Sequence, residues 1–363
     1  MSQMLAKREN FESTRLQPEP VRVVIVDDSK LIRRAVRGIL ESEPDIAVVG
    51  EAENGAQALD LVSRLKPDVI TLDVNMPVMD GISTIKHLMI KSPLPVLMLS
   101  TLTDEGAKVT FDALRYGATD FMLKPSRLGG DDVDNQQEEI VQRVRNASTV
   151  NMGSIRYMRI PKRDGSQPLP SRRDCEFVFG LGASEGGYRP LLNVIPALDP
   201  EKPAAYIAVF YTGERYLNAF EKYLSDYSGV RVVRAKNGML LNGGCCYLLN
   251  GNEYVTLSRR EDVTSFCIHP NPFPGRRGSI NMMLFSLAEM YGTNATGIIL
   301  SGAGEDGAEG LREIKRHGGQ TFIQKPDTCL YKEMPLSAIG NCDKKDMISD
   351  MQIASILNTT FFN

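Results

Sequence analysis

Short apolar runs alternate with amphipathic segments along the first third of the chain. The apolar runs are VRVVIV, IAVVGEA, DVITLD, LPVLMLS and TDFMLK. Segments with apolar residues at helical spacing, such as KLIRRAVRGILES and AQALDLVSRL, separate them. Strands that alternate with helices are typical of a parallel sheet covered by helices on both faces. The pattern therefore predicts a doubly wound, five-stranded α/β domain over residues 21–127.

A second alternating pattern begins near residue 173 and continues to the end of the chain. Its predicted strands include CEFVFGLGA, AAYIAVF and ATGIILS, and its predicted helices include ERYLNAFEKYL and SINMMLFSLAEMYG. CCYLLN and EYVTLS flank the turn signal Asn250-Gly251, which predicts a β-hairpin inserted in the sheet. We expect a second, mostly parallel α/β domain over residues 173–363.

Residues 128–172 differ from both domains. NQQEEIVQRVRNA carries Ile140, Val141 and Val144 at helical spacing, which predicts the last helix of the first domain. After Ala147 the chain is basic and rich in Ser, Pro and Gly, as linkers are. We predict a solvated tether here and an N-terminal arm over residues 1–20.

Composition narrows the class of protein. A chain of 363 residues suits two domains. Its net charge of -3 offers no basic field for nucleic acid, and no basic recognition helix follows the first domain, so a DNA-binding regulator is disfavoured. The apolar runs are far shorter than the about 20 residues of a membrane span, and the N-terminus lacks a signal core. We expect a cytoplasmic protein without membrane insertion.

Acidic and polar residues come directly after the predicted strands of the first domain. Asp27 and Asp28 follow the first strand and Asp73 ends the third. Ser100 ends the fourth strand and Lys124 follows the fifth. The carboxyl ends of parallel strands meet at one edge, where ligands bind. Crowded carboxylates repel one another unless a cation separates them, and Mg²⁺ prefers oxygen ligands, so a Mg²⁺ site is predicted.

The segment GLGASEGG places Ser184 in a Gly-x-Ser-x-Gly frame directly after an apolar run. Such a frame is consistent with a nucleophile elbow, in which a tight turn exposes the serine. Gly180, Gly182 and Gly186 also approximate a dinucleotide-binding loop. An ordinary tight turn is the third interpretation, and the segment by itself leaves all three open.

Motifs of the first domain resemble the flavodoxin-like receiver domain of two-component response regulators. These motifs are VDDS, LDVNMPVMDG, LMLST and YGATDFMLKP. The resemblance implies that Asp73 accepts a phosphoryl group. It also implies Mg²⁺ binding by Asp27, Asp28, Asp73 and the Asn75 carbonyl, phosphoryl binding by Ser100 and Lys124, and a switch aromatic at Phe121.

Motifs of the second domain resemble the catalytic domain of the chemotaxis protein-glutamate methylesterase and glutaminase family, CheB. They include GLGASEGG, RAKNGMLLNGGCCYLL, GIILSGAGEDGAEGLREIKRHGGQTFIQ and EMPLSAI. The family removes methyl groups from chemoreceptor glutamates and deamidates certain glutamines with a serine, a histidine and an aspartate. The resemblance implies a chemotaxis-type histidine kinase and chemoreceptor cytoplasmic domains as partners.

The family's catalytic positions are only partly filled. Ser184 stands at the nucleophile and Asp306 at the orienting aspartate, but alignment on Tyr216 and Phe220 places Tyr211 where the histidine belongs. The chain has 3 histidines. His87 is in the first domain, and a helix that Asp306 opens would carry His317 about 16 Å away at about 1.5 Å per residue. His269 falls in a predicted surface loop.

Tyr211 is a poor substitute for a histidine. A phenol with a pKa near 10 is only about 0.1% ionised at pH 7, and a neighbouring carboxylate disfavours its anion further. Two further positions near the catalytic residues also depart from the family. The residue after the serine is usually Thr and is Glu185 here, and a usual Met is Ala303 here. A carboxylate at Glu185 opposes the oxyanion that must develop, and with an ordinary pKa near 4.3 it is a weak base.

We therefore hypothesise a CheB-like response regulator that is phosphorylated on Asp73 and whose output domain is inactive or strongly impaired as a hydrolase. It would act by phosphorylation-dependent protein interaction. The alternative is an active methylesterase and glutaminase that uses a relocated base.

Overall fold

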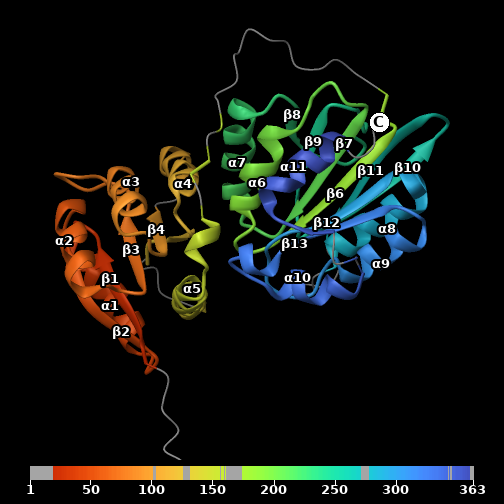
Figure 1. Cartoon of the computed structure of the whole chain (residues 1–363). Helices are drawn as coiled ribbons and strands as arrows, with labels where there is room; N and C mark the ends of the chain where they lie inside the picture. Colours follow the sequence, from red (N-terminus) through yellow and green to blue (C-terminus); the bar gives the residue numbers. More distant parts are fainter. Residues whose placement is uncertain are drawn as a thin grey trace, which may run out of the picture.

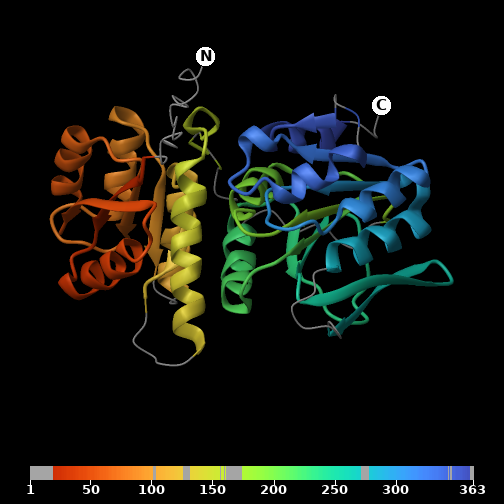
Figure 2. The same ribbon diagram turned by 90° about the horizontal axis from the view of Figure 1, so that it is seen from below.

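The computed structural model describes residues 19–100, 104–125, 131–155, 157–158, 160, 174–270, 278–341, 343 and 346–359. They form two α/β units that lie side by side (Figures 1 and 2). Most of the predicted N-terminal arm and residues 161–173 of the predicted tether lie outside the described residues. None of the described helices is long and apolar enough to cross a membrane.

The first unit is a parallel sheet with the strand order β2-β1-β3-β4-β5. The strands are β1 (Val21–Val26), β2 (Ile46–Ala52), β3 (Val69–Asp73), β4 (Val96–Ser100) and β5 (Asp120–Leu123). β3 and β4 are buried along their whole length, which explains why their sequences are mostly apolar rather than alternating. The five-stranded prediction is confirmed.

Five helices cover the two faces of this sheet. They are α1 (Lys30–Glu41), α2 (Gly55–Leu65), α3 (Gly81–Lys91), α4 (Asp104–Tyr116) and α5 (Asp131–Ser148). α1 and α5 bury their apolar side chains against one face, and α2, α3 and α4 against the other. Side chains of Ser29, Asn54 and Asp80 accept backbone N–H bonds and so define where α1, α2 and α3 begin.

The second unit is a seven-stranded parallel sheet with the order β14-β13-β12-β6-β7-β9-β8. The strands are β6 (Phe177–Ala183), β7 (Ala204–Phe210), β8 (Arg231–Arg234), β9 (Cys245–Asn250), β12 (Ala295–Ile299), β13 (Gln320–Gln324) and β14 (Met347–Ile348). One face is covered by α6 (Tyr188–Val194), α7 (Glu214–Tyr227) and α11 (Asp350–Thr359). The other is covered by α8 (Ser279–Tyr291), α9 (Ala308–Arg316) and α10 (Glu333–Ala338).

The predicted hairpin of CCYLLN with EYVTLS is wrong. CCYLLN is β9, which lies inside the main sheet between β7 and β8. EYVTLS begins β10 (Glu253–Arg260), which pairs with the antiparallel strand β11 (Val263–Pro270) in a separate two-stranded sheet. His269 therefore belongs to a strand rather than the predicted loop, and it is exposed there, opposite Tyr254.

The first part of the predicted tether packs against the receiver-like unit. Met158 is buried, and its N–H donates to the Arg115 carbonyl at 2.9 Å. Arg115 in turn donates from Nη2 to the Ile160 carbonyl at 2.7 Å, and the rings of Tyr157 and Tyr116 stack. The prediction of a solvated tether is therefore wrong for these residues.

Helix α4 is the main contact between the two units. The Tyr223 hydroxyl of α7 donates to Asp112 Oδ1 at 2.6 Å, and Arg189 of α6 donates to the Leu114 carbonyl at 2.7 Å. Phe111 lies in a cluster of rings that includes Tyr188 and Phe220 of the second unit. Because Arg189 and the ring cluster around Phe111 are buried, a movement of α4 must disturb the second unit.

Candidate phosphoryl site and hydrolase-like site

Three carboxylates converge at the carboxyl edge of the first sheet. Asp27 and Asp28 follow β1, Asp73 ends β3, and one oxygen of each lies within 4.8 Å of the others. Asp27 and Asp73 are buried, whereas Asp28 is exposed. The structure therefore brings the predicted acidic residues together.

Lys124 lies between two of these carboxylates. Its Nζ is 2.8 Å from Asp27 Oδ2 and 2.8 Å from Asp73 Oδ2. Burial raises the pKa of the Asp73 carboxyl, although the bond and charge of Lys124 oppose this shift. Burial also acts to lower the pKa of Lys124, but hydrogen bonds to Asp27 and Asp73 outweigh it and raise that pKa overall.

The donor set fits a hard divalent cation. Three carboxylates and the Lys124 ammonium leave a net of two negative charges on clustered oxygen atoms, which a hard divalent cation would balance. The Asn75 backbone donates a hydrogen bond to Asp73, which places the Asn75 main chain beside the cluster; this bond opposes the rise in the pKa of Asp73 that burial causes. Mg²⁺ binding by Asp27, Asp28, Asp73 and the Asn75 carbonyl stays a prediction.

Ser100 and Phe121 lie where the receiver resemblance implies. Ser100 ends β4 and is buried, with its Oγ 2.8 Å from Thr110 Oγ1 of α4. Phe121, in β5, packs against Tyr188 and Tyr216 of the second unit. The predicted switch aromatic thus contacts the output domain directly.

Ser184 lies in a tight strand–turn–helix at the carboxyl edge of the second sheet. β6 ends at Ala183, the Gly187 N–H donates to the Ser184 carbonyl at 2.9 Å, and α6 begins at Tyr188. Gly186 has a φ of 76°, a conformation that favours glycine, and a Cβ there would lie 3.0 Å from the Cβ of Leu330. The shape agrees with the nucleophile-elbow interpretation.

The Ser184 hydroxyl donates to the Glu185 carboxylate. Ser184 itself is fully buried, so the turn does not expose it as the elbow interpretation expected. A serine whose proton is held by its own neighbour must exchange that bond before it can attack a substrate carbonyl. Glu185, unlike the threonine usual in the family, supplies this competing acceptor.

The Tyr211 hydroxyl is fully engaged with helix α8 and Asp306. It donates to Asp306 Oδ2 at 2.7 Å and accepts the N–H groups of Gly278 and Ser279 at 2.9 and 3.2 Å. A phenol has one proton and two lone pairs, so these three bonds use its full capacity. Tyr211 follows β7 and Asp306 lies in the loop before α9, which places both beside the β6 end that carries Ser184.

Asp306 completes a cap for the same helix. Its Oδ2 and Oδ1 accept the N–H groups of Ile280 and Asn281 at 3.0 and 3.1 Å. Gly278, at the N-cap of α8, has no side chain for this purpose. A helix leaves its first N–H groups unpaired, and a carboxylate there also interacts favourably with the helix dipole. Tyr211 and Asp306 together therefore act as a cap for α8.

The environment of Tyr211 opposes a role as a base. Burial raises the pKa of its phenol, and the charge and hydrogen bond of Asp306 raise that pKa further. A phenol that stays protonated at neutral pH cannot take a proton from Ser184. The structure thus agrees with the sequence argument against Tyr211.

The three histidines have other surroundings. His87, in α3, has Nδ1 at 2.8 Å from the Ser83 carbonyl, and His317, at the end of α9, has Nδ1 at 3.0 Å from the Glu313 carbonyl. Each of these two imidazole rings is thus hydrogen-bonded to a backbone carbonyl one turn earlier in its own helix. His269 is exposed on β11.

Removing the Tyr211 hydroxyl should destabilise the output domain. Tyr211→Phe leaves the Gly278 and Ser279 amides without their acceptor, which we expect to lower the free energy of unfolding by about 1–3 kcal/mol. Tyr216→Phe is the matched control, because that buried hydroxyl has no hydrogen-bond partner among the described residues. Urea denaturation measures both variants. If Tyr211→Phe and Tyr216→Phe lower the free energy of unfolding equally, the capping role of Tyr211 is contradicted.

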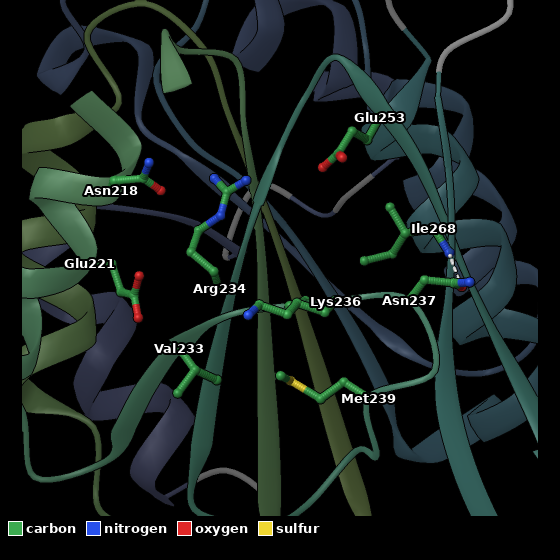
Figure 3. Close-up of a pocket in the computed structure, with 10 residues that line it drawn as sticks. Asn218, Glu221, Val233, Arg234, Lys236, Asn237, Met239, Glu253 and Ile268 are labelled. Atoms are coloured by element: carbon green, nitrogen blue, oxygen red, sulfur yellow. Dashed lines mark hydrogen bonds between the residues drawn. The ribbon is translucent and has the colours of Figure 1, made fainter. Parts of the chain in front are cut away.

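A separate groove of about 700 Å³ follows the free edge of β8 (Figure 3). Residues of α7, β8, the loop after β8, and the β10–β11 hairpin line it, among them Arg234, Lys236, Glu221 and Glu253. Two cations are thus matched by two carboxylates, so the lining does not favour a ligand of either sign. Ser184, Tyr211 and Asp306 are not among its described lining residues.

Comparison with known proteins identifies the family. Residues 179–357 match the family model for the CheB methylesterase, and residues 23–129 match that for the response regulator receiver domain. A protein-glutamate methylesterase/protein-glutamine glutaminase of Pyrococcus abyssi is 33% identical over 326 residues, which cover 88% of each chain. The chain belongs to the CheB methylesterase family.

Other relatives in this CheB family carry the same name. The protein-glutamate methylesterase/protein-glutamine glutaminase of Archaeoglobus fulgidus is 36% identical over 322 residues, or 88% of this chain and 92% of the relative. Among solved structures, the Thermotoga maritima CheB methylesterase catalytic domain matches with 24% identity and a TM-score of 0.48, over 51% of this chain and 98% of that one. The two family models show that the chain combines a receiver domain with a CheB-type methylesterase domain.

Proposed function

We propose that this CheB-family protein is a phosphorylation-dependent interaction protein whose methylesterase domain has lost efficient hydrolysis. The observation that carries the proposal is the Tyr211 hydroxyl, which donates to Asp306 and accepts two amides of α8. At the position where the family's triad has a histidine, this chain has a side chain that caps a helix. Ser184 thereby lacks the imidazole that would remove its proton.

In the receiver domain, Asp73 would accept a phosphoryl group from a chemotaxis-type histidine kinase. Bound Mg²⁺, held by the three aspartates and the Asn75 carbonyl, would neutralise charge on the transferring group. Lys124 already lies 2.8 Å from Asp73 Oδ2 and would pair with a phosphoryl oxygen. Ser100 would donate its hydroxyl proton to another.

In the output domain, the signal would pass through the contact with α4 and Phe121. Phe121 packs on Tyr188, the first residue of α6 and a near neighbour of Ser184. A shift of these rings would change the surface around the elbow and its affinity for a cytoplasmic partner. Chemoreceptor cytoplasmic segments are the partner that the family membership supports best.

One observation favours an active enzyme as the second candidate. The Ser184 hydroxyl donates to Glu185, so this carboxylate is placed to act as a relocated base. A carboxylate with an ordinary pKa near 4.3 removes a hydroxyl proton inefficiently at neutral pH, and its charge opposes an oxyanion nearby. We therefore favour the non-catalytic proposal.

The test compares wild type with Ser184→Ala in the release of methanol from a methylated chemoreceptor fragment. Both proteins carry the phosphoryl group during the assay. We expect equal rates, because Ser184 does not act as a nucleophile in this proposal. A much slower Ser184→Ala protein would favour the second candidate.

A further inference from the structure

Arg33 of α1 is a buried arginine that contacts the loop between β1 and α1. Its exposed fraction is 5%, although the three neighbouring charged residues of the predicted metal site carry the opposite sign. Nη1 donates to the Asp27 carbonyl at 2.9 Å and to the Asp28 carbonyl at 3.3 Å. One guanidinium thus fixes the direction of two consecutive main-chain carbonyl groups.

Two glutamates hold the other nitrogen atoms of Arg33. Nε donates to Glu51 Oε2 at 3.2 Å, and Nη2 donates to Glu53 Oε1 at 2.6 Å. Glu51 is in β2 and Glu53 directly follows that strand. A guanidinium carries five N–H donors in one fixed plane, which suits these four acceptors. Arg33 therefore joins the Asp27-Asp28 loop to the end of the neighbouring strand.

The carboxylates of Asp27 and Asp28 depend on this loop to different degrees. The Asp27 carboxylate has bonds of its own, because Oδ1 accepts the Ser29 N–H at 2.9 Å and Oδ2 pairs with Lys124. The Asp28 carboxylate is exposed, and it has no hydrogen bond or ion pair to another residue in the part of the chain that the structure describes. The position of Asp28 is thus set mainly by the main chain that Arg33 holds.

We propose that Arg33 is a positioning residue that orients Asp28 for Mg²⁺ by holding the main chain of the Asp27-Asp28 loop. The inference rests on the Mg²⁺ site proposed for the receiver domain. Residues that hold metal ligands in place without touching the metal commonly lower its affinity about 10- to 100-fold when they are mutated. Arg33 acts in this way through two carbonyl groups rather than through the carboxylates.

Charge and geometry predict opposite results for variants of Arg33. If Arg33 acted only through its charge, Arg33→Lys would bind Mg²⁺ as wild type does, and Arg33→Gln would bind it more tightly because a positive charge is gone. A positioning role predicts weaker binding by both variants. We expect a loss of about tenfold for Arg33→Lys, because an ammonium has only three donors and cannot hold four acceptors.

Isothermal titration calorimetry of the full chain with MgCl₂ measures these affinities, and Arg37→Lys is the matched control. Arg37 is also in α1 and also bonds to Glu51, but its other partner is Glu41 rather than the loop. The control should bind Mg²⁺ like wild type. Wild-type affinity in Arg33→Lys, equal weakening in Arg37→Lys, or tighter binding by Arg33→Gln would overturn the inference.

Hydrogen exchange without Mg²⁺ separates a local effect from damage to the whole domain. In Arg33→Lys, we expect faster exchange at the amides of Asp28 and Ser29, while the amides of β3 stay as protected as in wild type. Faster exchange throughout the receiver domain would show that Arg33 supports the fold rather than the orientation of Asp28, and it would also overturn the inference.

The titration also separates this inference from the proposed function. If wild type binds Mg²⁺ and Arg33→Lys binds it equally well, the role of Arg33 fails and the Mg²⁺ site stands. If wild type binds no Mg²⁺, the proposed Mg²⁺ site fails and the inference fails with it.

Discussion

Asp73→Asn is expected to take up no phosphoryl group from acetyl phosphate, whereas wild type takes up as much as one group per chain. Asp73 lies beside Lys124 and within 4.8 Å of Asp27 and Asp28, so a bound cation and the ammonium can neutralise charge on a phosphoryl group that arrives there. Asp27 has the same neighbours, and the choice of Asp73 rests on its match to the receiver motif. An amide is neutral and a much weaker nucleophile. Intact-mass spectrometry measures the incorporation.

The control for Asp73→Asn is Asp60→Asn, which removes an exposed carboxylate on α2. It should incorporate phosphate like wild type, and chelation of divalent cations should abolish incorporation in both. Hydrogen exchange of α7 should rise after phosphorylation in wild type and the control but not in Asp73→Asn, because α4 holds α7 through Tyr223. Phosphate on Asp73→Asn at the wild-type level would refute the assignment.

Glu185→Thr combined with Tyr211→His is expected to create serine-dependent hydrolysis at least about a hundredfold above wild type. Loss of a triad histidine lowers the rate of hydrolysis by up to about 10⁶-fold, so recovery of even a small part of that rate is readily measured. The histidine would stand beside Asp306, and threonine would release the Ser184 proton from the carboxylate that holds it. Full recovery is not expected, because α8 loses two hydrogen bonds to Tyr211.

Two further variants complete this prediction. Tyr211→His alone should gain less, because Glu185 still accepts the Ser184 proton. Adding Ser184→Ala to the pair should return the rate to the wild-type level. If the pair hydrolyses a methyl ester no faster than it does with Ser184→Ala added, then the missing histidine and Glu185 do not explain the loss of activity.

Much of both sites was predictable because parallel strands fix where side chains meet. Asp73 ends a buried strand, and Asp27, Ser184 and Tyr211 each directly follow one. Their proximity within each sheet therefore follows from strand order. The pattern did not predict that α8, which is distant in the sequence, would contact Tyr211. Nothing local to Tyr211 indicates that Gly278 and Ser279 would bring their amides to its hydroxyl.

The wrong hairpin has a similar origin. Asn250-Gly251 is a strong local turn signal, but pairing is decided by burial across the sheet. β9 is buried at every position, as a central strand must be, whereas β10 alternates between buried and partly exposed residues. That alternation continues in β11 and could have indicated a separate two-stranded sheet joined at Glu261 and Asp262.

The central claim is that Ser184 is no longer a nucleophile. It is tested most directly by the rate at which phosphorylated protein releases methanol from a methylated chemoreceptor fragment, measured for wild type and Ser184→Ala side by side. We predict that both proteins release methanol at the same rate, and that this rate equals the spontaneous rate measured without protein. A wild-type rate well above that level, abolished by Ser184→Ala, would contradict it.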